Sequence, residues 1–186
     1  MTKTVKAPLS EDDVDSLKIG DRVLLSGLIY TARDQTHKRL IEAIKKSDTL
    51  PFPLRGQILF YAGPTPAPAG QSIGSIGPTT ASRLDSYTPL LLERGLKGMI
   101  GKGNRGPAVK EAIKNNRAVY FLAVGGAAAY LAQYVEEAVV IAYKDLGPEA
   151  IYRLKVKDFP VIVAIDASGR DIFLEGPLKY AKLRSG

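Results

Sequence analysis

The chain of 186 residues contains no cysteine and a single histidine, His37. Without cysteine it forms no disulfide and supplies no thiolate to an iron–sulfur cluster. One histidine without cysteine also cannot complete a zinc site of the cysteine and histidine type. A metal centre of either kind is therefore excluded for this chain alone, and its cofactor-binding and metal-ligand sets are predicted to be empty.

Long apolar runs are missing as well. No stretch approaches the ~20 residues that cross a membrane, and the two lysines among the first ten residues are not followed by the apolar segment of a signal peptide. We therefore expect a cytoplasmic protein with no membrane partner. The length suits one hydrophobic core, so a single domain over residues 1–186 is predicted, with a polar tail from about Gly176.

The formal net charge is +7, but the lysines and arginines form no block of five or more. A basic balance can serve nucleic acid, an anionic membrane surface, an anionic small substrate or an acidic protein partner. Because the basic residues are spread out and the aromatic residues lie inside apolar runs, most of this charge is interpreted as a solvated surface. We expect no nucleic-acid partner.

Strand and helix patterns alternate through the middle of the chain. Strands are predicted at 22–31, 57–61, 96–100, 118–124 and 138–143, followed by a closing hairpin or two separate strands at 151–156 and 161–165. Helices are predicted at 10–17, 31–46, 80–94 with a break at Pro89, 107–116 and 126–134. This order predicts a mixed α/β domain whose site lies in the loops at strand ends.

The loop Gly101–Gly106 reads Gly-x-Gly-x-x-Gly, which is a dinucleotide-binding fingerprint when it follows a strand and precedes a helix. Its mid-chain position and the lack of an acidic residue about 20 positions later disfavour a nucleotide. Lys102 and Arg105 also make the loop more cationic than a pyrophosphate requires. We favour a loop that offers Lys102 and backbone N–H groups to a small anion, with some of its glycines serving only a tight turn.

A second stretch begins at Gly77-Pro78 and continues through Thr79, Thr80 and Arg83. One threonine hydroxyl is expected to cap the following helix. Two hydroxyls, free N–H groups and an arginine within one turn also make an anion site. Arg83 would grip a carboxylate with two parallel hydrogen bonds, which a lysine could not do.

The third stretch surrounds the single histidine at a strand-to-helix junction. His37 follows Arg33 by four residues and precedes Lys38-Arg39. Nearby positive charge and the helix N-terminus both favour a neutral imidazole, which can act as a base near an anionic substrate. A structural role for a lone histidine is the alternative.

Together the three stretches resemble the beta subunit, or C-terminal domain, of class I iron–sulfur fumarate hydratases and of the related L-tartrate dehydratases. The matching residues are Ala32-Arg33-Asp34 with His37-Lys38-Arg39, Gly77-Pro78-Thr79-Thr80 with Arg83 and Asp85, and Gly101-Lys102-Gly103-Asn104. Order and spacing agree over about 24–173. Gln35-Thr36 departs from the small residues, such as alanine, that relatives often carry there.

This resemblance implies an α/β fold of the swivelling β/β/α type, with a mixed-sheet, barrel-like core flanked by helices. It also implies a partner, an alpha subunit whose cysteines hold a 4Fe–4S cluster, in a hetero-oligomer of two alpha–beta pairs. The chain would be inactive alone, and the active site would lie between the subunits.

The implied reaction is the reversible dehydration of (S)-malate to fumarate. Arg33, Arg83 and Lys102 would bind the substrate carboxylates, with Thr79 and Thr80 as hydrogen-bonding partners. His37 is the acid/base candidate by family position, and a threonine hydroxyl, that of Thr79, is the rival. An L-tartrate dehydratase beta subunit is the alternative enzyme, and a non-catalytic module that binds an anion or a nucleotide is the alternative of another class.

Overall fold

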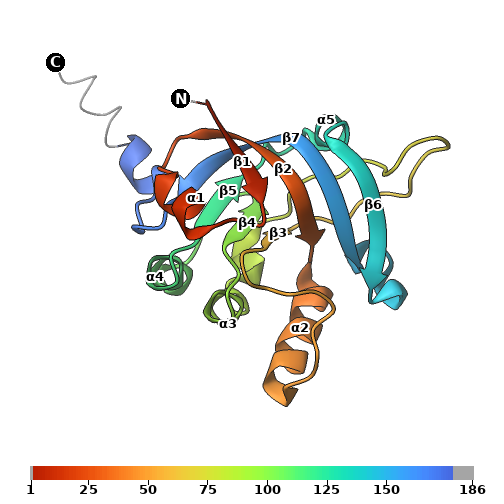
Figure 1. The fold of residues 1–186 in the computed structure, drawn as a ribbon, viewed down its shortest axis with the longest axis horizontal. Helices are drawn as coiled ribbons and strands as arrows, with labels where there is room; N and C mark the ends of the chain where they lie inside the picture. The colour runs from red at the N-terminus through yellow and green to blue at the C-terminus, as the bar shows by residue number, and fades with distance from the viewer. Residues whose placement is uncertain (1, 178–186) are drawn as a thin grey trace.

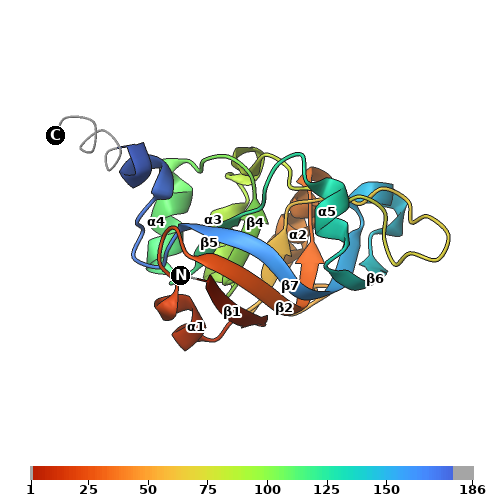
Figure 2. The ribbon, with the colours of Figure 1, turned by 90° about the horizontal axis from the view of Figure 1, so that it is seen from above.

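A ring of five strands forms the centre of the computed structural model, which describes residues 2–177 (Figures 1 and 2). Its strands are β2 (Arg22–Thr31), β3 (Ile58–Phe60), β4 (Gly98–Gly101), β5 (Val119–Leu122) and β7 (Ile151–Ile165). β2 to β5 are parallel neighbours, and β7 closes the ring by pairing antiparallel with both β5 and β2. The predicted mixed, barrel-like sheet is confirmed.

Two further strands pair with β2 and β7, the two strands whose antiparallel pairing closes the ring. β1 (Thr2–Ala7) pairs parallel with β2, and β6 (Val135–Ala142) pairs antiparallel with β7. The sequence did not predict β1, because its short, lysine-containing segment alternates between exposed and buried residues and buries only Val5 and Ala7 fully.

The apolar strands are buried on both faces. Ile58 and Phe60 point into the core inside the ring, while Leu59 and Tyr61 pack among the surrounding helices. Strands buried in this way contain nearly continuous apolar sequence, which explains why the segment at 57–61 shows no polar alternation.

Helices α2 (Asp34–Lys46), α3 (Thr88–Glu93) and α4 (Pro107–Asn115) cover one side of the ring (Figure 1). The short α1 (Glu11–Ser16) begins with the predicted Ser10 cap, in which Ser10 and Asp13 cap each other's backbone N–H groups. At another end of the molecule, α5 (Ala128–Ala132) lies beside β6 and the long loop 61–80, where Ser72 bonds the carbonyl oxygen of Glu136 (Figure 2).

Two predictions on secondary structure are wrong in detail. Residues 151–165 form one strand, because Asp158 adopts a left-handed φ of 52° and absorbs the irregularity next to Pro160. The predicted helix at 80–94 is two elements, the 3₁₀ turn η1 (Ala81–Leu84) and α3. Pro89 lies in the first turn of α3, where its missing N–H costs nothing, so the break falls just before it.

The carboxyl ends of β2 to β5 meet at one edge of the ring because these strands are parallel. The loops that follow them begin at Ala32, Tyr61, Lys102 and Ala123. This edge is the expected position of a site in a sheet of this kind. No helix within residues 2–177 is long and apolar enough to cross a membrane, and the polar tail predicted from Gly176 lies, beyond residue 177, outside the described residues.

Candidate functional site

The glycine-rich loop and the threonine stretch are joined through their backbones. The N–H of Lys102 donates to the carbonyl oxygen of Thr79 at 3.1 Å, and the N–H of Ala81 donates to the carbonyl oxygen of Lys102 at 2.9 Å. Thr79 also donates its N–H to the carbonyl oxygen of Tyr61 at 2.7 Å, directly after β3. Thr79, Thr80 and Lys102 therefore lie side by side at the carboxyl edge of the ring.

The histidine stretch joins the same assembly through Asp34 at the start of α2. Arg83 Nε donates to Asp34 Oδ1 at 3.1 Å, and a terminal nitrogen of the same guanidinium lies 3.0 Å from that oxygen. Arg33, the residue before Asp34, occupies the N-cap position of α2 without a side-chain cap bond. The structure thus brings all the predicted site residues to one edge, although they span Arg33 to Lys102 in sequence.

Buried polar atoms without partners concentrate at this junction. Within residues 2–177, five buried side-chain nitrogen or oxygen atoms make no hydrogen bond, and three of them are Arg33 Nε, Asp34 Oδ2 and His37 Nε2. Of the other two, Asp171 Oδ2 forms an ion pair with Lys110 at 2.5 Å. Since a buried polar atom without a partner costs about 1–3 kcal/mol, three within five residues make this junction the candidate binding site.

His37 is fully buried on the first turns of α2. Its Nδ1–H donates to the carbonyl oxygen of Arg33 at 2.7 Å, which leaves Nε2 as a lone-pair acceptor. The rings of Tyr61 and Tyr87 pack against it at 5.2 and 6.0 Å. Burial, together with the charge of Arg105, lowers the pKa of His37 to about 4 against the opposing effects of the bond to Arg33 and the charge of Asp34. The imidazole is therefore neutral, as the sequence indicates, but chiefly for a reason the sequence does not show.

The hydroxyls and the lysine are free to bind something else. Thr80 is the N-cap residue of η1, yet its side chain makes no cap bond, contrary to the predicted capping role. Thr80 and Lys102 are exposed and Thr79 is half-buried. Side-chain hydrogen bonds within residues 2–177 involve none of these three side chains. Within residues 2–177, two hydroxyls and an ammonium group at this edge are thus without side-chain hydrogen bonds.

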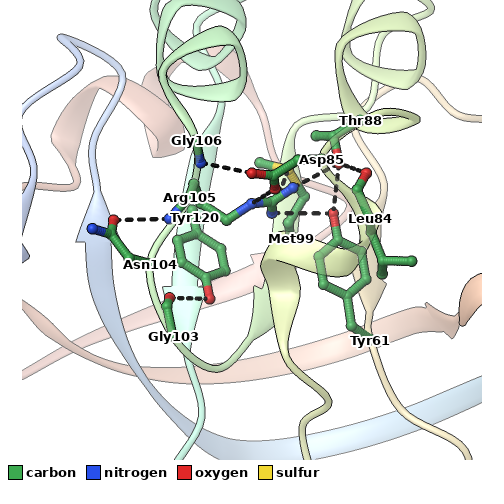
Figure 3. Close-up of polar contacts among 10 residues, drawn as sticks. All are labelled: Tyr61, Leu84, Asp85, Thr88, Met99, Gly103, Asn104, Arg105, Gly106 and Tyr120. Atoms are coloured by element: carbon green, nitrogen blue, oxygen red, sulfur yellow. Dashed lines mark hydrogen bonds and ion pairs between the residues drawn. The ribbon is translucent and has the colours of Figure 1, made fainter.

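The glycine-rich loop differs from its prediction in one respect. Arg105 turns inward, with a fully buried side chain, and bonds Asp85 at 2.7 Å (Figure 3). The N–H of Gly106, which begins α4, donates to the second oxygen of Asp85 at 2.6 Å, and the N–H of Arg105 donates to Asn104 Oδ1 at 2.8 Å. The protein itself occupies two amides that a phosphate would need, which argues against a nucleotide in this loop. Lys102 is the cation of the loop that remains exposed.

Sequence reasoning gave no role to Asp34, Tyr61, Asp85 or Arg105. Asp34 and Asp85 each lie one or two residues from an arginine of the motifs, which signalled carboxylates near the site but not which arginine each would hold. Tyr61 follows a strand directly, so its position at the edge could have been inferred. No sequence signal showed that Arg105 is buried and Lys102 is exposed.

Three cavities of about 440, 600 and 260 Å³ lie elsewhere, beside the 65–75 loop, beside the C-terminal end of α2 and beside α5. None of the three is lined by the predicted site residues, so the candidate site is not one of these spaces. Over residues 2–177 there is also no group of three histidine, aspartate or glutamate side chains arranged to hold a metal ion. With no cysteine in the sequence, the residues present do not fit an iron–sulfur cluster.

Comparison with known proteins matches residues 2–176 to the family described as Fumarase C-terminus. The chain belongs to this family. It is 39% identical over 173 residues to "Fumarate hydratase class I, anaerobic" of Escherichia coli K12, and the match covers 92% of the chain but 31% of that protein. It is 34% identical over 173 residues to "Fumarate hydratase 2" of Leishmania major, covering 91% of the chain and 30% of that protein.

A second group of relatives is similar over nearly its full length. The chain is 34% identical over 189 aligned positions to "L(+)-tartrate dehydratase subunit beta" of Escherichia coli K12, covering 99% of the chain and 92% of that subunit. The family resemblance drawn from the three motifs is thereby confirmed. The chain spans about a third of the fumarate hydratases it matches, and most of the tartrate dehydratase subunit.

Proposed function

We propose that this chain is the beta subunit of a cytoplasmic iron–sulfur hydro-lyase that interconverts (S)-malate and fumarate. The observation that supports this most is the cluster of unpartnered buried atoms at Arg33, Asp34 and His37, at the same edge of the ring as Thr79, Thr80 and Lys102. A site that contains cations, hydroxyls and unused hydrogen-bonding capacity suits a small dicarboxylate. Family membership narrows the chemistry to dehydration of a hydroxy acid of this kind.

Binding of the two carboxylates is assigned to Arg33, Arg83 and Lys102. Asp34 holds Arg83 through Nε and one terminal nitrogen, which fixes the plane of the guanidinium and leaves further N–H groups on its other edge. Fixed cations of this kind stabilise negative charge that develops on a carboxylate when the neighbouring carbon loses its proton. The hydroxyls of Thr79 and Thr80 would donate to the same oxygens.

Two residues compete for the proton transfer. His37 is neutral and keeps Nε2 as an acceptor, but it is fully buried. Thr79 is only half-buried, and none of the side-chain hydrogen bonds within residues 2–177 involves its hydroxyl, so Thr79 is more accessible to a substrate than His37. We therefore propose Thr79 as the group in contact with the reacting carbon, with His37 as an internal acid/base group behind Tyr61.

A cluster-bearing alpha subunit completes this proposal. Because this chain has no cysteine, the 4Fe–4S cluster belongs on the partner, in a complex of two alpha–beta pairs. The beta subunit is then inactive alone, and its site residues face the partner at the interface.

Co-expression with a three-cysteine alpha subunit, followed by anaerobic reconstitution with iron and sulfide, tests the proposal. The pair is expected to interconvert malate and fumarate, measured through absorbance of the fumarate double bond, while this chain alone shows no turnover. A pair that binds its cluster and converts neither malate nor tartrate would rule out the enzyme and leave the non-catalytic anion-binding module.

L-tartrate is the second candidate substrate, because the chain matches 92% of the length of a tartrate dehydratase beta subunit. Malate and tartrate differ by one hydroxyl, which a few pocket groups can distinguish by a large factor. Comparing kcat/KM for the two acids on the same reconstituted complex decides between them.

A further inference from the structure

The buried guanidinium of Arg105 lies among Asp85, Thr88 and Tyr61, which come from two other segments of the chain (Figure 3). Nε donates to Asp85 at 2.7 Å, one terminal nitrogen donates to Thr88 Oγ1 at 2.7 Å, and the other donates to the hydroxyl of Tyr61 at 3.3 Å. The guanidinium carbon also lies 5.3 Å from the ring centre of Tyr61 and 5.1 Å from that of Tyr120. Every nitrogen of this side chain therefore has a partner.

The partners of Arg105 belong to different parts of the site. Asp85 and Thr88 follow Arg83 on the segment that begins with the threonine pair, and Thr88 also donates to the carbonyl oxygen of Leu84 at 2.9 Å. Arg105 itself ends the loop that contains Lys102. The second oxygen of Asp85 accepts the N–H of Gly106 at 2.6 Å, so two bonds to consecutive residues join the segments.

Two tyrosines connect the ion pair of Arg105 and Asp85 to the rest of the site. Tyr120 donates its hydroxyl to the carbonyl oxygen of Gly103 at 2.9 Å and so supports the loop from β5. The carbonyl oxygen of Tyr61 accepts the N–H of Thr79, and the Tyr61 ring packs against His37. A Cβ on Gly101 would lie 3.0 Å from both Tyr61 and Ala81, which shows how tightly the loops pack here.

Retention of the charge on Arg105 has a clear cause. Burial disfavours the charged form, but the Tyr61 oxygen and the Asp85 carboxylate outweigh it and raise the pKa of Arg105 above its usual value. A buried ion pair is seldom a net source of stability compared with apolar residues of similar size, whereas it does fix geometry. Arg105 and Asp85 are thus suited to hold groups in register.

From these contacts we infer that Arg105 and Asp85 are positioning residues that fix the Lys102 loop relative to Thr79, Thr80 and Arg83. This inference rests on the proposed function in assigning those four residues to the substrate. Neither Arg105 nor Asp85 touches the substrate. They set the distance between the cations that hold its two carboxylates.

Arg105→Lys keeps the charge but loses the planar fork, so it can satisfy only part of the set of partners. In the reconstituted complex, kcat/KM for malate is expected to fall about 100-fold, with at least a tenfold rise in KM, because small misplacements of binding groups have effects of this size. Thr88→Val, which removes one acceptor at similar volume, should show a smaller change in the same direction. The matched control is Arg117→Lys, at the exposed pair of Arg117 with Asp15, which should leave both constants unchanged.

Amide hydrogen exchange in the full chain provides a readout that does not depend on turnover. Arg105→Lys and Thr88→Val should accelerate exchange in both 79–88 and 101–106, while the strands of the ring keep their protection. Acceleration in only one of the two segments, or an unchanged KM in a folded Arg105→Lys complex, would overturn the inference. If the wild-type complex shows no turnover, the proposed function fails and the exchange pattern still decides on Arg105 and Asp85.

Discussion

Two polar clusters flank Tyr61, and they differ in how completely their hydrogen bonds are made. The Arg105 cluster buries a full charge and satisfies every guanidinium nitrogen, mainly through Asp85, Thr88 and Tyr61. The cluster at the start of α2 buries Arg33 Nε, Asp34 Oδ2 and His37 Nε2 without partners. A polar network whose hydrogen bonds are all made stabilises one arrangement of its side chains, whereas polar atoms without partners can still form hydrogen bonds to a ligand. The first is therefore scaffold, and the second, together with the exposed cations, is proposed to receive the substrate.

Removing one member of the satisfied cluster should produce the largest loss of stability. Arg105→Met leaves Asp85 without its partner, and the free energy of unfolding is expected to fall by about 3–5 kcal/mol. Chemical denaturation measures this loss. Arg105→Met combined with Asp85→Asn should recover part of it, because no unpaired charge remains, and a double variant as unstable as the sum of both changes would contradict this account.

Arg83→Lys changes the cluster at the start of α2, where Arg83 bonds Asp34. The charge persists but the bidentate grip on a carboxylate is lost, so kcat/KM of the reconstituted complex should fall by about 100-fold, equivalent to about 2.7 kcal/mol in transition-state binding. Stability should change little, because the pair with Asp34 is half-exposed. Near-normal kinetics in this variant would remove Arg83 from the proposed site.

The burial of His37 predicts how stability depends on pH. The folded state protonates His37 only near pH 4 and the unfolded chain near 6.5, so acid favours the unfolded chain. The contribution is fully present above about pH 6.5 and is lost as the pH falls towards 4. Between pH 7.5 and 5, the wild type should lose about 2 kcal/mol more than His37→Gln. Parallel urea titrations of the two proteins measure it, and identical pH slopes would show that His37 titrates normally.

Lys102→Met should separate function from stability most sharply. Lys102 is exposed and makes no side-chain hydrogen bond within residues 2–177, so unfolding should change by no more than about 0.5 kcal/mol. Substrate affinity of the complex should nevertheless weaken at least tenfold, because a carboxylate loses its cation. A thermal melt and a KM measurement on the same preparation test both expectations.

Much of this fold follows from the sequence because its signals are local. The apolar runs at 22–31 and 118–124, the Ser10 cap and Pro107 each specify an element through their immediate neighbours. The closing strand was predicted in two pieces because Asp158 and Pro160 look like a turn. Only the pairing of β7 with β2, which is set by distant residues, keeps that segment extended.

The candidate site was predictable as a set of residues but not as an arrangement. Motif order placed Arg33, Thr79, Arg83 and Lys102 in loops after strands, and parallel pairing brings those loops together. The different fates of Lys102 and Arg105, three residues apart, depend on Asp85 and Tyr61 from other strand–loop units. The unpartnered Nε2 of His37 likewise results from packing against Tyr61 and Tyr87, which no local pattern encodes.

The long strand β7 also constrains the order in which the molecule can assemble. It pairs with β2, which lies more than a hundred residues earlier, and with both β5 and β6. During synthesis, β2 to β5 can associate as an open sheet, but the ring cannot close until residues 151–165 have emerged, because β7 is the strand that joins β5 to β2. Such long-range pairings slow folding and leave strand edges uncovered for longer. A lower rate of expression should therefore raise the yield of folded chain, because at a lower concentration of new chains the exposed edges of β2 and β5 meet another molecule less often before β7 covers them.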